Sequence, residues 1–355
     1  MKYIPELDGL RAIAVFMVVF GHSASTLAGG YSGWLAPLFF VSDGNLGVLI
    51  FFVLSGFLIT SLLINERENT GTVSISAFFV RRTLRIFPAF YTYIGFVALL
   101  VATGYAAASL PQILGASLHV WNYIGVLGIG HTPVQGTVIL GHFWSLSLEE
   151  QFYWLWPAVF LALTLAGSRT LILLLILLVP ALRILVYFLY PDQRPYLGMM
   201  FHTSIDGIAV GVGAALFRAQ LTDILMRAGR RIPIGALLLG YILLLSPLLR
   251  FHLAGMWFAT YGKTIDAVMI AALILVVGSQ PDLRIAALLR TPAFRFFGKI
   301  SFSLYLWQQM FCLAGSPLAL PFPLGIPVAI AFAAASYYLI ERPFLALKPR
   351  RPVAA

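Results

Sequence analysis

The stretch LDGLRAIAVFMVVFGH (residues 7–22) places an arginine and a histidine inside the first apolar run of the chain. Arg11 and His22 are eleven residues apart. On a helix this is about three turns, so both side chains share one face, roughly 16 Å apart along the axis. Ionisable side chains at membrane depth cost roughly 2.5–3.5 kcal/mol each, and their default interpretation is functional. The structural alternative is that Arg11 snorkels to the membrane surface and His22 bonds to a neighbouring helix. Both interpretations make this stretch a membrane-spanning helix.

The composition extends this interpretation to the whole chain. Of its 355 residues, 60% are hydrophobic and 10% are charged, and the mean hydropathy is +0.92. This profile excludes a soluble domain and predicts an all-α polytopic membrane protein. The net charge of +10 is typical of a protein whose cytoplasmic loops carry excess Lys and Arg beside anionic lipids. Membrane lipids are therefore expected partners, and nucleic acid is not.

The N-terminal segment and the few candidate metal ligands narrow the possibilities. MKYIPELDGL (residues 1–10) has one lysine, two acids and no small-residue cleavage site. The first span is therefore predicted to be retained and not removed as a signal peptide. The lone Cys312 excludes an internal disulfide and a cysteine metal site. The histidines are scattered, without HxxxH or HExxH spacing, so no metal is expected.

Ten apolar runs are long enough to cross a bilayer. A further run, 113–130, is ambiguous because it is short and contains His119, Asn122 and several glycines. It either spans the membrane or lies re-entrant or interfacial. The ten runs are 10–28, 45–64, 87–104, 146–166, 170–190, 205–219, 232–249, 264–279, 300–316 and 325–340.

The distribution of charge decides between ten and eleven spans. If 113–130 does not cross, 18 of the 23 basic residues lie on one side, and segment 105–144 on the other side has no Lys or Arg. If it crosses, every later loop changes sides and this asymmetry is lost. The positive-inside rule therefore predicts ten spans, both termini in the cytoplasm, and 113–130 as a re-entrant or interfacial segment outside. We expect one transmembrane domain over residues 1–345 and a short basic cytoplasmic tail over 346–355.

Three arginines, Arg81, Arg82 and Arg85, form a basic turn in FFVRRTLRIFP at the predicted cytoplasmic start of the third span. Their i, i+3 and i, i+4 spacings place the guanidiniums on one side of a helix. Arginine suits phosphate because it stays charged and binds in a bidentate geometry. The alternative is an anchor that sets topology and contacts lipid headgroups.

The motif FFVLSGFLIT (residues 51–60) places Ser55 and Gly56 in the middle of the second span. Small residues at such a position are typical of a packing notch for another helix. A notch of this kind can also admit a narrow ligand arm. A nucleophilic role for Ser55 is disfavoured because the sequence has no G-x-S-x-G elbow.

Two acids and several aromatic residues begin the fourth span in WSLSLEEQFYWLW (residues 144–156). We expect Glu149 and Glu150 at the outer membrane boundary, beside Trp144 and Tyr153. Carboxylates among aromatic rings suit a polyhydroxy ligand such as a sugar, and the helical spacing of Glu149 and Tyr153 aims one acid inward. The alternative is an interfacial aromatic belt with two solvated acids.

Asp206 begins the predicted sixth span in FHTSIDGIAVG (residues 201–211). An acid at a helix N-terminus is stabilised by the helix dipole, so Asp206 can be a simple cap. A contact with an acceptor substrate is equally compatible with this position.

Taken in order, these motifs resemble those of the acyltransferase-3 family of integral membrane O-acyltransferases. The resemblance covers nearly the whole chain. It implies ten spans and transfer of an acyl group, usually acetyl, from cytoplasmic acyl-CoA to a carbohydrate or similar hydroxyl acceptor. It also implies functional roles for Arg11, His22, the 81–85 arginines and Glu149. The motifs are LDGLRA with its later histidine, FFVLSGFLIT, RRTLRIFP, WSLSLEEQFY, the Asp206 segment, SFSLYLW (301–307) and ERPF (341–344).

Two departures from the family pattern concern the acceptor side. The family often has an arginine shortly before the aspartate, where this chain has Thr203-Ser204-Ile205-Asp206. It also often has a histidine after the SLYLW tryptophan, where this chain has Gln308. Many relatives carry an extra hydrolase-like domain, and no such domain is expected here. The transfer is therefore expected to be completed within the membrane domain.

The predicted reaction is O-acyl transfer from acyl-CoA, most simply acetyl-CoA, to a hydroxyl of a cell-envelope or exported carbohydrate or its lipid-linked precursor, in a bacterial inner membrane. The 81–85 arginines, with Arg11 as a further contact, would hold the phosphates, and the pantetheine arm would pass Ser55. His22 would act as general base, while Glu149 would orient it or bind the sugar. The further acceptor contacts would be Trp144, Glu150, Tyr153 and Asp206.

The alternative function is a transporter or flippase for a polar envelope molecule, whose path the same charges would line. No internal repeat or inverted pair is visible in the sequence, which weakens this alternative. A sensor or scaffold is disfavoured by the number of ionisable residues in the spans.

Overall fold

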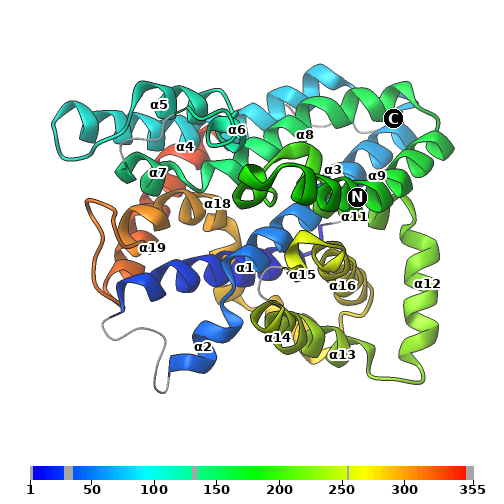
Figure 1. Ribbon diagram of the computed structural model, residues 1–355. Coiled ribbons are helices and arrows are strands. Elements are labelled where there is room, and N and C mark those ends of the chain that lie inside the picture. Colours follow the sequence, from blue (N-terminus) through cyan, green and yellow to red (C-terminus); the bar gives the residue numbers. More distant parts are fainter. Residues whose placement is uncertain (1–2, 28–34, 130–133, 254–255, 349–355) are drawn as a thin grey trace.

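The computed structural model describes residues 3–27, 35–129, 134–253 and 256–348, and Figure 1 shows them as helices joined by connections. No β-strand occurs in these ranges. The all-α, multi-pass membrane class predicted from composition is therefore confirmed. Most of the predicted tail over 346–355 lies outside the described residues, which end at Lys348.

The longer helices form a bundle, and shorter helices connect or cover them (Figure 1). Two π-helical turns, Tyr241–Leu245 and Tyr337–Glu341, continue α13 into α14 and α19 into α20. The bundle helices are α1 (Glu6–Ser23), α3 (Gly44–Thr70), α4 (Ile75–Ala102), α8 (Phe143–Ala162), α9 (Leu165–Leu189), α11 (Asp206–Leu216), α13 (Ile234–Gly240), α14 (Ser246–His252), α16 (Gly262–Ser279), α18 (Pro292–Cys312) and α19 (Gly325–Ser336). The shorter ones are α2 (Ala36–Val41), α5 (Leu110–Ser117), α6 (Trp121–Ile124), α7 (Val134–Leu140), α10 (Phe201–Ser204), α12 (Arg218–Gly229), α15 (Met256–Ala259), α17 (Arg284–Leu289) and α20 (Arg342–Ala346).

Seven stretches of the described chain are long and apolar enough to cross a membrane, and an eighth is reached if α11 and α12, which meet at 86°, form one broken span. The predicted total of ten also requires α8 and α18, which are 20 and 21 residues long. These two helices carry buried polar and charged side chains, so hydropathy does not identify them. The number of spans and their orientation stay predictions. The seven stretches are Glu6–Thr26, Ala36–Thr70, Ile75–Ala102, Leu165–Leu189, Ile234–His252, Gly262–Ser279 and Gly325–Ala346.

A tight turn joins α3 and α4, the two helices that carry FFVLSGFLIT and RRTLRIFP. Asp43 is the N-cap of α3, and its side chain accepts hydrogen bonds from the amides of Asn45 and Leu46. α3 ends at Gly71, which adopts φ 75°, a left-handed conformation that favours glycine. α4 then starts at Ser74, whose hydroxyl caps Ala77. The chain therefore passes from α3 to α4 within a few residues.

Small residues allow neighbouring helices of the bundle to approach each other closely. A Cβ on Gly56 would lie 2.2 Å from the carbonyl oxygen of Ile208, and one on Gly298 would lie 2.1 Å from that of Asp8. Gly56 thus forms the expected packing notch, between α3 and α11. Gly298 brings α18 against α1. These two contacts hold α1, α3, α11 and α18 around a common centre.

The ambiguous run 113–130 contains no helix long enough to span a bilayer in its described part. α5 and α6 have eight and four residues. His119, between them, is buried and stacks on Phe90 of α4 at 4.4 Å, and burial lowers its pKa to about 4. The segment therefore packs against the bundle, as expected for a re-entrant or interfacial piece.

Candidate active site

Three cavities lie along one path through the bundle. The first, the basic cleft, has a volume of about 670 Å³ and lies where α1 and α18 begin. A narrow cavity of about 80 Å³ follows, and Arg11 and Ser55 line both. The third, the histidine cleft, has a volume of about 900 Å³ and is lined by His22. Tyr305 lines both the narrow cavity and the histidine cleft, so the three cavities are consecutive.

The basic cleft carries far more positive than negative charge. Its lining side chains include six cations but two carboxylates, Asp8 and Glu341, which leaves an excess of four positive charges. Asp8 already accepts hydrogen bonds from Tyr3 and Arg11, and Glu341 accepts one from Ser303. A ligand with several negative charges would complement this cleft. The six cations are Arg11, Arg82, Arg85, Arg295, Lys299 and Lys348.

The arginines of FFVRRTLRIFP do not all face this cleft. Arg82 and Arg85 line it, and the Arg82 guanidinium also lies 3.5 Å from the centre of the Tyr153 ring. Arg85 is exposed to the cleft and forms no ion pair with a described carboxylate. Arg81 instead pairs with Glu66 at 2.9 Å and is not a described lining residue of the three cavities. The position of Arg81 therefore favours an anchor of the α3–α4 turn over a phosphate contact.

Glu149 and Glu150 lie inside the bundle. α8 begins at Phe143, so Glu149 is about 9 Å along the helix from its start. Glu149 accepts a 2.7 Å hydrogen bond from the Ser55 hydroxyl in the narrow cavity. Glu150 is 3% exposed, and its Oε1 lies 3.5 Å from Arg82 Nε. Both acids face other helices inside the bundle, so the alternative of two solvated acids is wrong, while their place at the outer membrane boundary stays a prediction.

His22 is oriented by a residue of α18. Its Nδ1 lies 2.8 Å from the side-chain oxygen of Gln308, so Nδ1 donates and Nε2 keeps the lone pair that can accept a proton. Gln308 is fully buried, and its amide nitrogen donates to the carbonyl oxygen of Tyr305 at 3.4 Å. Glu149 was one candidate for the orienting group, but its hydrogen bond goes to Ser55.

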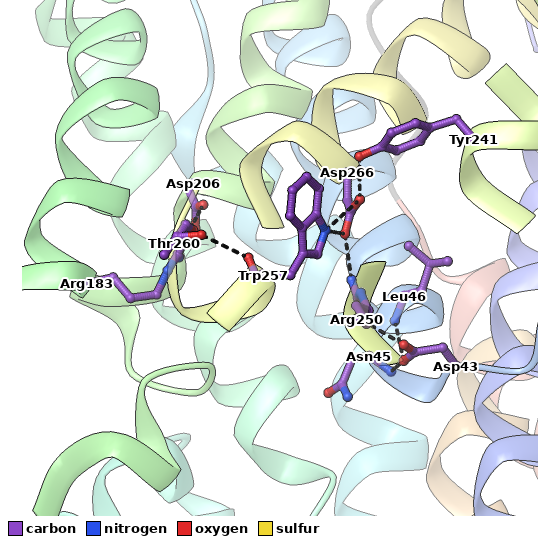
Figure 2. Close-up of polar contacts among 10 residues, drawn as sticks. All are labelled: Asp43, Asn45, Leu46, Arg183, Asp206, Tyr241, Arg250, Trp257, Thr260 and Asp266. Atoms are coloured by element: carbon purple, nitrogen blue, oxygen red, sulfur yellow. Dashed lines mark hydrogen bonds and ion pairs between the residues drawn. The ribbon is translucent and has the colours of Figure 1, made fainter. Parts of the chain in front are cut away.

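The charges in the histidine cleft are balanced by a network of side chains from several helices, shown in Figure 2. Arg250 of α14 contacts Asp43 and Asp266 at 2.9 Å each, so one guanidinium lies between two carboxylates. Tyr241 and Trp257 donate further hydrogen bonds to Asp266. Asp43 and Arg250 both line the cleft, which therefore has polar groups but no excess of positive charge comparable to that of the basic cleft.

A family comparison covers nearly all of the residues described above. The model of the acyltransferase domain known as acyltransferase 3 matches residues 4–341. The chain belongs to the acyltransferase-3 family. The match includes the narrow cavity, the histidine cleft and most of the basic cleft, whose lining residues Tyr3, Leu345 and Lys348 lie outside it. No solved structure matches the chain.

Individual relatives of the acyltransferase-3 chain are named as O-acetyltransferases. A Staphylococcus aureus (strain COL) protein named "Putative O-acetyltransferase" is 29% identical over 364 residues, which cover 97% of this chain and 58% of that protein. A peptidoglycan O-acetyltransferase of Listeria monocytogenes is 34% identical over 170 residues, which cover 45% of this chain and 24% of that protein. The chain thus spans little more than half the length of the curated relatives that it matches from end to end.

The arginine that the acyltransferase-3 pattern often has shortly before Asp206 is supplied in space by Arg183 of α9. Both side chains are fully buried, and two 3.1 Å hydrogen bonds join them. Asp206 also accepts a 2.6 Å hydrogen bond from Thr264. Arg183 donates to the carbonyl oxygen of Thr260 (Figure 2). Asp206 therefore ties α9 and α16 to α11. The predicted acceptor contact is replaced by a buried structural ion pair.

The predicted acceptor contacts separate in the structure. Trp144 lines the histidine cleft, whereas Glu150 and Tyr153 are buried near Arg82. The sequence interpretation assigned no role to Gln308, although its departure from the family pattern was a signal. It also assigned none to Asp43 or Arg250, for which no motif gave a signal.

Proposed function

We propose that this protein transfers an acyl group, most simply acetyl, from cytoplasmic acyl-CoA to a hydroxyl of a cell-envelope or exported carbohydrate or its lipid-linked precursor, in a bacterial inner membrane. One observation carries this proposal. Three neighbouring cavities with shared lining residues lead from a cleft with excess cations to a charge-balanced cleft that His22 lines. An anionic donor suits the first cleft, and a hydroxyl acceptor suits the second.

The residues of the basic cleft fit the donor. Arg11, Arg82 and Arg85 line both the basic cleft and the narrow cavity, so phosphates held there would direct the attached arm into the cavity. An extended pantetheine arm of about 14 bonds reaches roughly 16 Å. Arg11 and His22 are also separated by roughly 16 Å along their helix. Phosphates at Arg11 would therefore allow the thioester to reach the level of His22.

His22 would act as the general base of the transfer. Its Nε2 would take the proton of the acceptor hydroxyl as the oxygen attacks the acyl carbon. The new C–O ester bond forms, the C–S bond breaks, and the leaving thiolate takes up a proton. Bound acyl-CoA supplies the acyl group and this leaving group. The hydrogen bond to Gln308 would hold the imidazole in the required tautomer.

Glu149 and Ser55 would line the passage of the donor arm. Their 2.7 Å hydrogen bond lies in the narrow cavity, where the arm would have to pass. Glu150 would support this region indirectly, through its 3.5 Å ion pair with Arg82. Neither acid contacts His22 among the described side-chain hydrogen bonds, so we assign them to the donor side.

The acceptor would enter the histidine cleft. Trp144 offers an aromatic face, and Asp43, Asn45 and Arg250 line the same cleft; aromatic and polar groups of this kind suit an uncharged sugar ring. The printed name of the Listeria monocytogenes relative, a peptidoglycan O-acetyltransferase, supports a polymer of the cell envelope as the acceptor class.

The test is turnover of acetyl-CoA by the purified protein in lipid vesicles, with thiol release as the readout, together with mass spectrometry of envelope glycans from a deletion strain. The expected result is thiol release in the presence of envelope glycan and loss of O-acetyl groups in the deletion strain. A transporter or flippase would move a glycan across the vesicle membrane without thiol release. That outcome would replace the proposed function by the alternative.

A further inference from the structure

One wall of the basic cleft carries three cations that the donor arm does not require. Arg295 and Lys299 lie one turn apart on α18, and Lys348 lies just beyond α20. Residues four apart share one helix face, so both α18 cations project to the same side. We name these three residues the α18 rim. Gly298, between them in sequence, packs against Asp8 of α1 and fixes this face beside the cleft.

The described carboxylates do not neutralise the two helical members of the α18 rim. Arg295 and Lys299 form no ion pair with any of them. Arg295 lies 6.0 Å from the centre of the Tyr3 ring, and its Nε is buried without a hydrogen-bond partner among the described atoms. Lys299 is exposed. A second anionic group would complement this wall.

The α18 rim is separate from the arginines at the narrow cavity. Arg11, Arg82 and Arg85 line both the basic cleft and that cavity, whereas the rim residues line the basic cleft alone among the described cavities. An acyl-CoA likewise carries phosphates at two separate positions. The pyrophosphate lies at the root of the pantetheine arm, and a phosphate monoester lies on the ribose, farther from the thioester.

We propose that the α18 rim, Arg295, Lys299 and Lys348, forms a second phosphate subsite that binds the ribose 3′-phosphate of the donor. This rests on the proposed function, because it requires a coenzyme A thioester in the basic cleft. The consequence is selectivity: the protein would distinguish acetyl-CoA from 3′-dephospho-acetyl-CoA, which has the same arm and the same thioester.

The test is the ratio of two dissociation constants, measured for acetyl-CoA and 3′-dephospho-acetyl-CoA on protein in phosphatidylcholine nanodiscs. The wild type should bind acetyl-CoA roughly tenfold or more tightly, as expected for charge-assisted hydrogen bonds to one phosphate. Lys299→Ala should weaken binding of acetyl-CoA and leave that of the dephospho compound unchanged, so that the ratio falls toward one. If Lys299 and the 3′-phosphate contact each other, Lys299→Ala combined with the dephospho compound should weaken binding no more than either change alone.

The matched control is Arg227→Ala on α12, whose side chain is 75% exposed and pairs with Asp223 away from the cleft. It should keep the wild-type ratio. Lys299→Gln gives a second variant at an exposed position, and Arg295→Ala should move the ratio in the same direction as Lys299→Ala.

Three results would overturn the subsite. Equal binding of both compounds by the wild type would do so while leaving the proposed function intact, because acetyl-CoA would still bind at the inner arginines. A Lys299→Ala variant that weakens both compounds equally would reduce the rim to a general charge effect. Loss of the Lys299 dependence in phosphatidylglycerol nanodiscs would assign the rim to lipid headgroups. If neither thioester binds the wild type, the proposed function fails together with the subsite.

Discussion

The basic cleft and the histidine cleft differ less in size than in how their charges are compensated. Their volumes are about 670 and 900 Å³. In the basic cleft six cations face two carboxylates, and Arg85 has no described ion-pair partner. In the histidine cleft Arg250 lies between Asp43 and Asp266. Buried cations are costly unless an anion compensates them. The uncompensated cleft therefore favours an anionic donor, and the compensated one favours an uncharged acceptor.

The largest expected effect concerns which cleft faces the cytoplasm, because labelling of a single cysteine is nearly all-or-none. The positive-inside rule places the basic cleft inside. Glu68→Cys, near the C-terminal end of α3, should react with an impermeant maleimide after cell lysis but not in intact cells. Ala107→Cys, beyond the other end of α4, should react in intact cells. Both changes are made in a Cys312→Ser background, because Cys312 is the one native cysteine.

Both labelled positions are exposed, so membrane topology, and not burial, decides the result. Labelling at residue 68 but not at residue 107 in intact cells would show that the protein has the opposite orientation in the membrane. The donor cleft would then face away from the cytoplasmic pool of acyl-CoA, and the assignment of the two clefts would be wrong.

The next largest effect is expected at His22. Removal of a general base typically lowers the rate by about 10²–10⁴-fold while leaving binding largely intact. His22→Ala should therefore abolish acyl transfer, yet the dissociation constant for acetyl-CoA should stay unchanged, because His22 lines the other cleft. His22→Asn keeps a hydrogen-bonding side chain but no proton acceptor of the right basicity, and it should be nearly as inactive. Turnover above about a tenth of wild type in His22→Asn would make His22 a packing residue.

The residues of the path were predictable where local periodicity determines them. Arg11 and His22 share one helix face, and both line the path, at opposite ends. Arg82 and Arg85 lie on the cleft side of α4, as the helical spacing indicated. Arg81 has the same local spacing, but its contact with Glu66 depends on the turn between α3 and α4. Sequence spacing could not distinguish Arg81 from its neighbours.

The remaining features depend on contacts between residues far apart in the sequence. His22 and Gln308 are 286 positions apart, and Asp43 and Arg250 are 207 apart. No periodicity connects such pairs, because helix packing at contacts such as that of Gly56 brings them together. The depth of Glu149 depended on where α8 begins, and His142 at its N-cap makes no side-chain capping hydrogen bond that a sequence pattern could have indicated.

Arg85 and Arg81, one helix turn apart on α4, allow a matched test of the basic cleft as the donor site. Arg85→Ala should raise the KM for acetyl-CoA roughly tenfold or more, the loss expected for a charge-assisted contact to phosphate. Arg85→Lys should restore part of this, since a point charge does not reproduce the planar fork. Arg81→Ala is the matched control because Arg81 pairs with Glu66 away from the cleft. Equal KM values in Arg85→Ala and wild type would leave Arg85 as a topology anchor.

The smallest expected effect tests how the histidine cleft orients its base. Gln308→Leu removes the oxygen that accepts from His22 Nδ1 at little change in volume, and one neutral hydrogen bond is worth about 0.5–1.5 kcal/mol, or roughly two- to tenfold in rate. The decrease should appear in kcat and not in the KM for acetyl-CoA, because Gln308 does not line the basic cleft among the described residues. Gln308→His introduces a ring nitrogen that can accept the same hydrogen bond, so it should retain more activity than Gln308→Leu.

A wild-type kcat in Gln308→Leu would show that another group sets the tautomer of His22. A loss as large as that of His22→Ala would mean that Gln308 itself contacts the reacting groups.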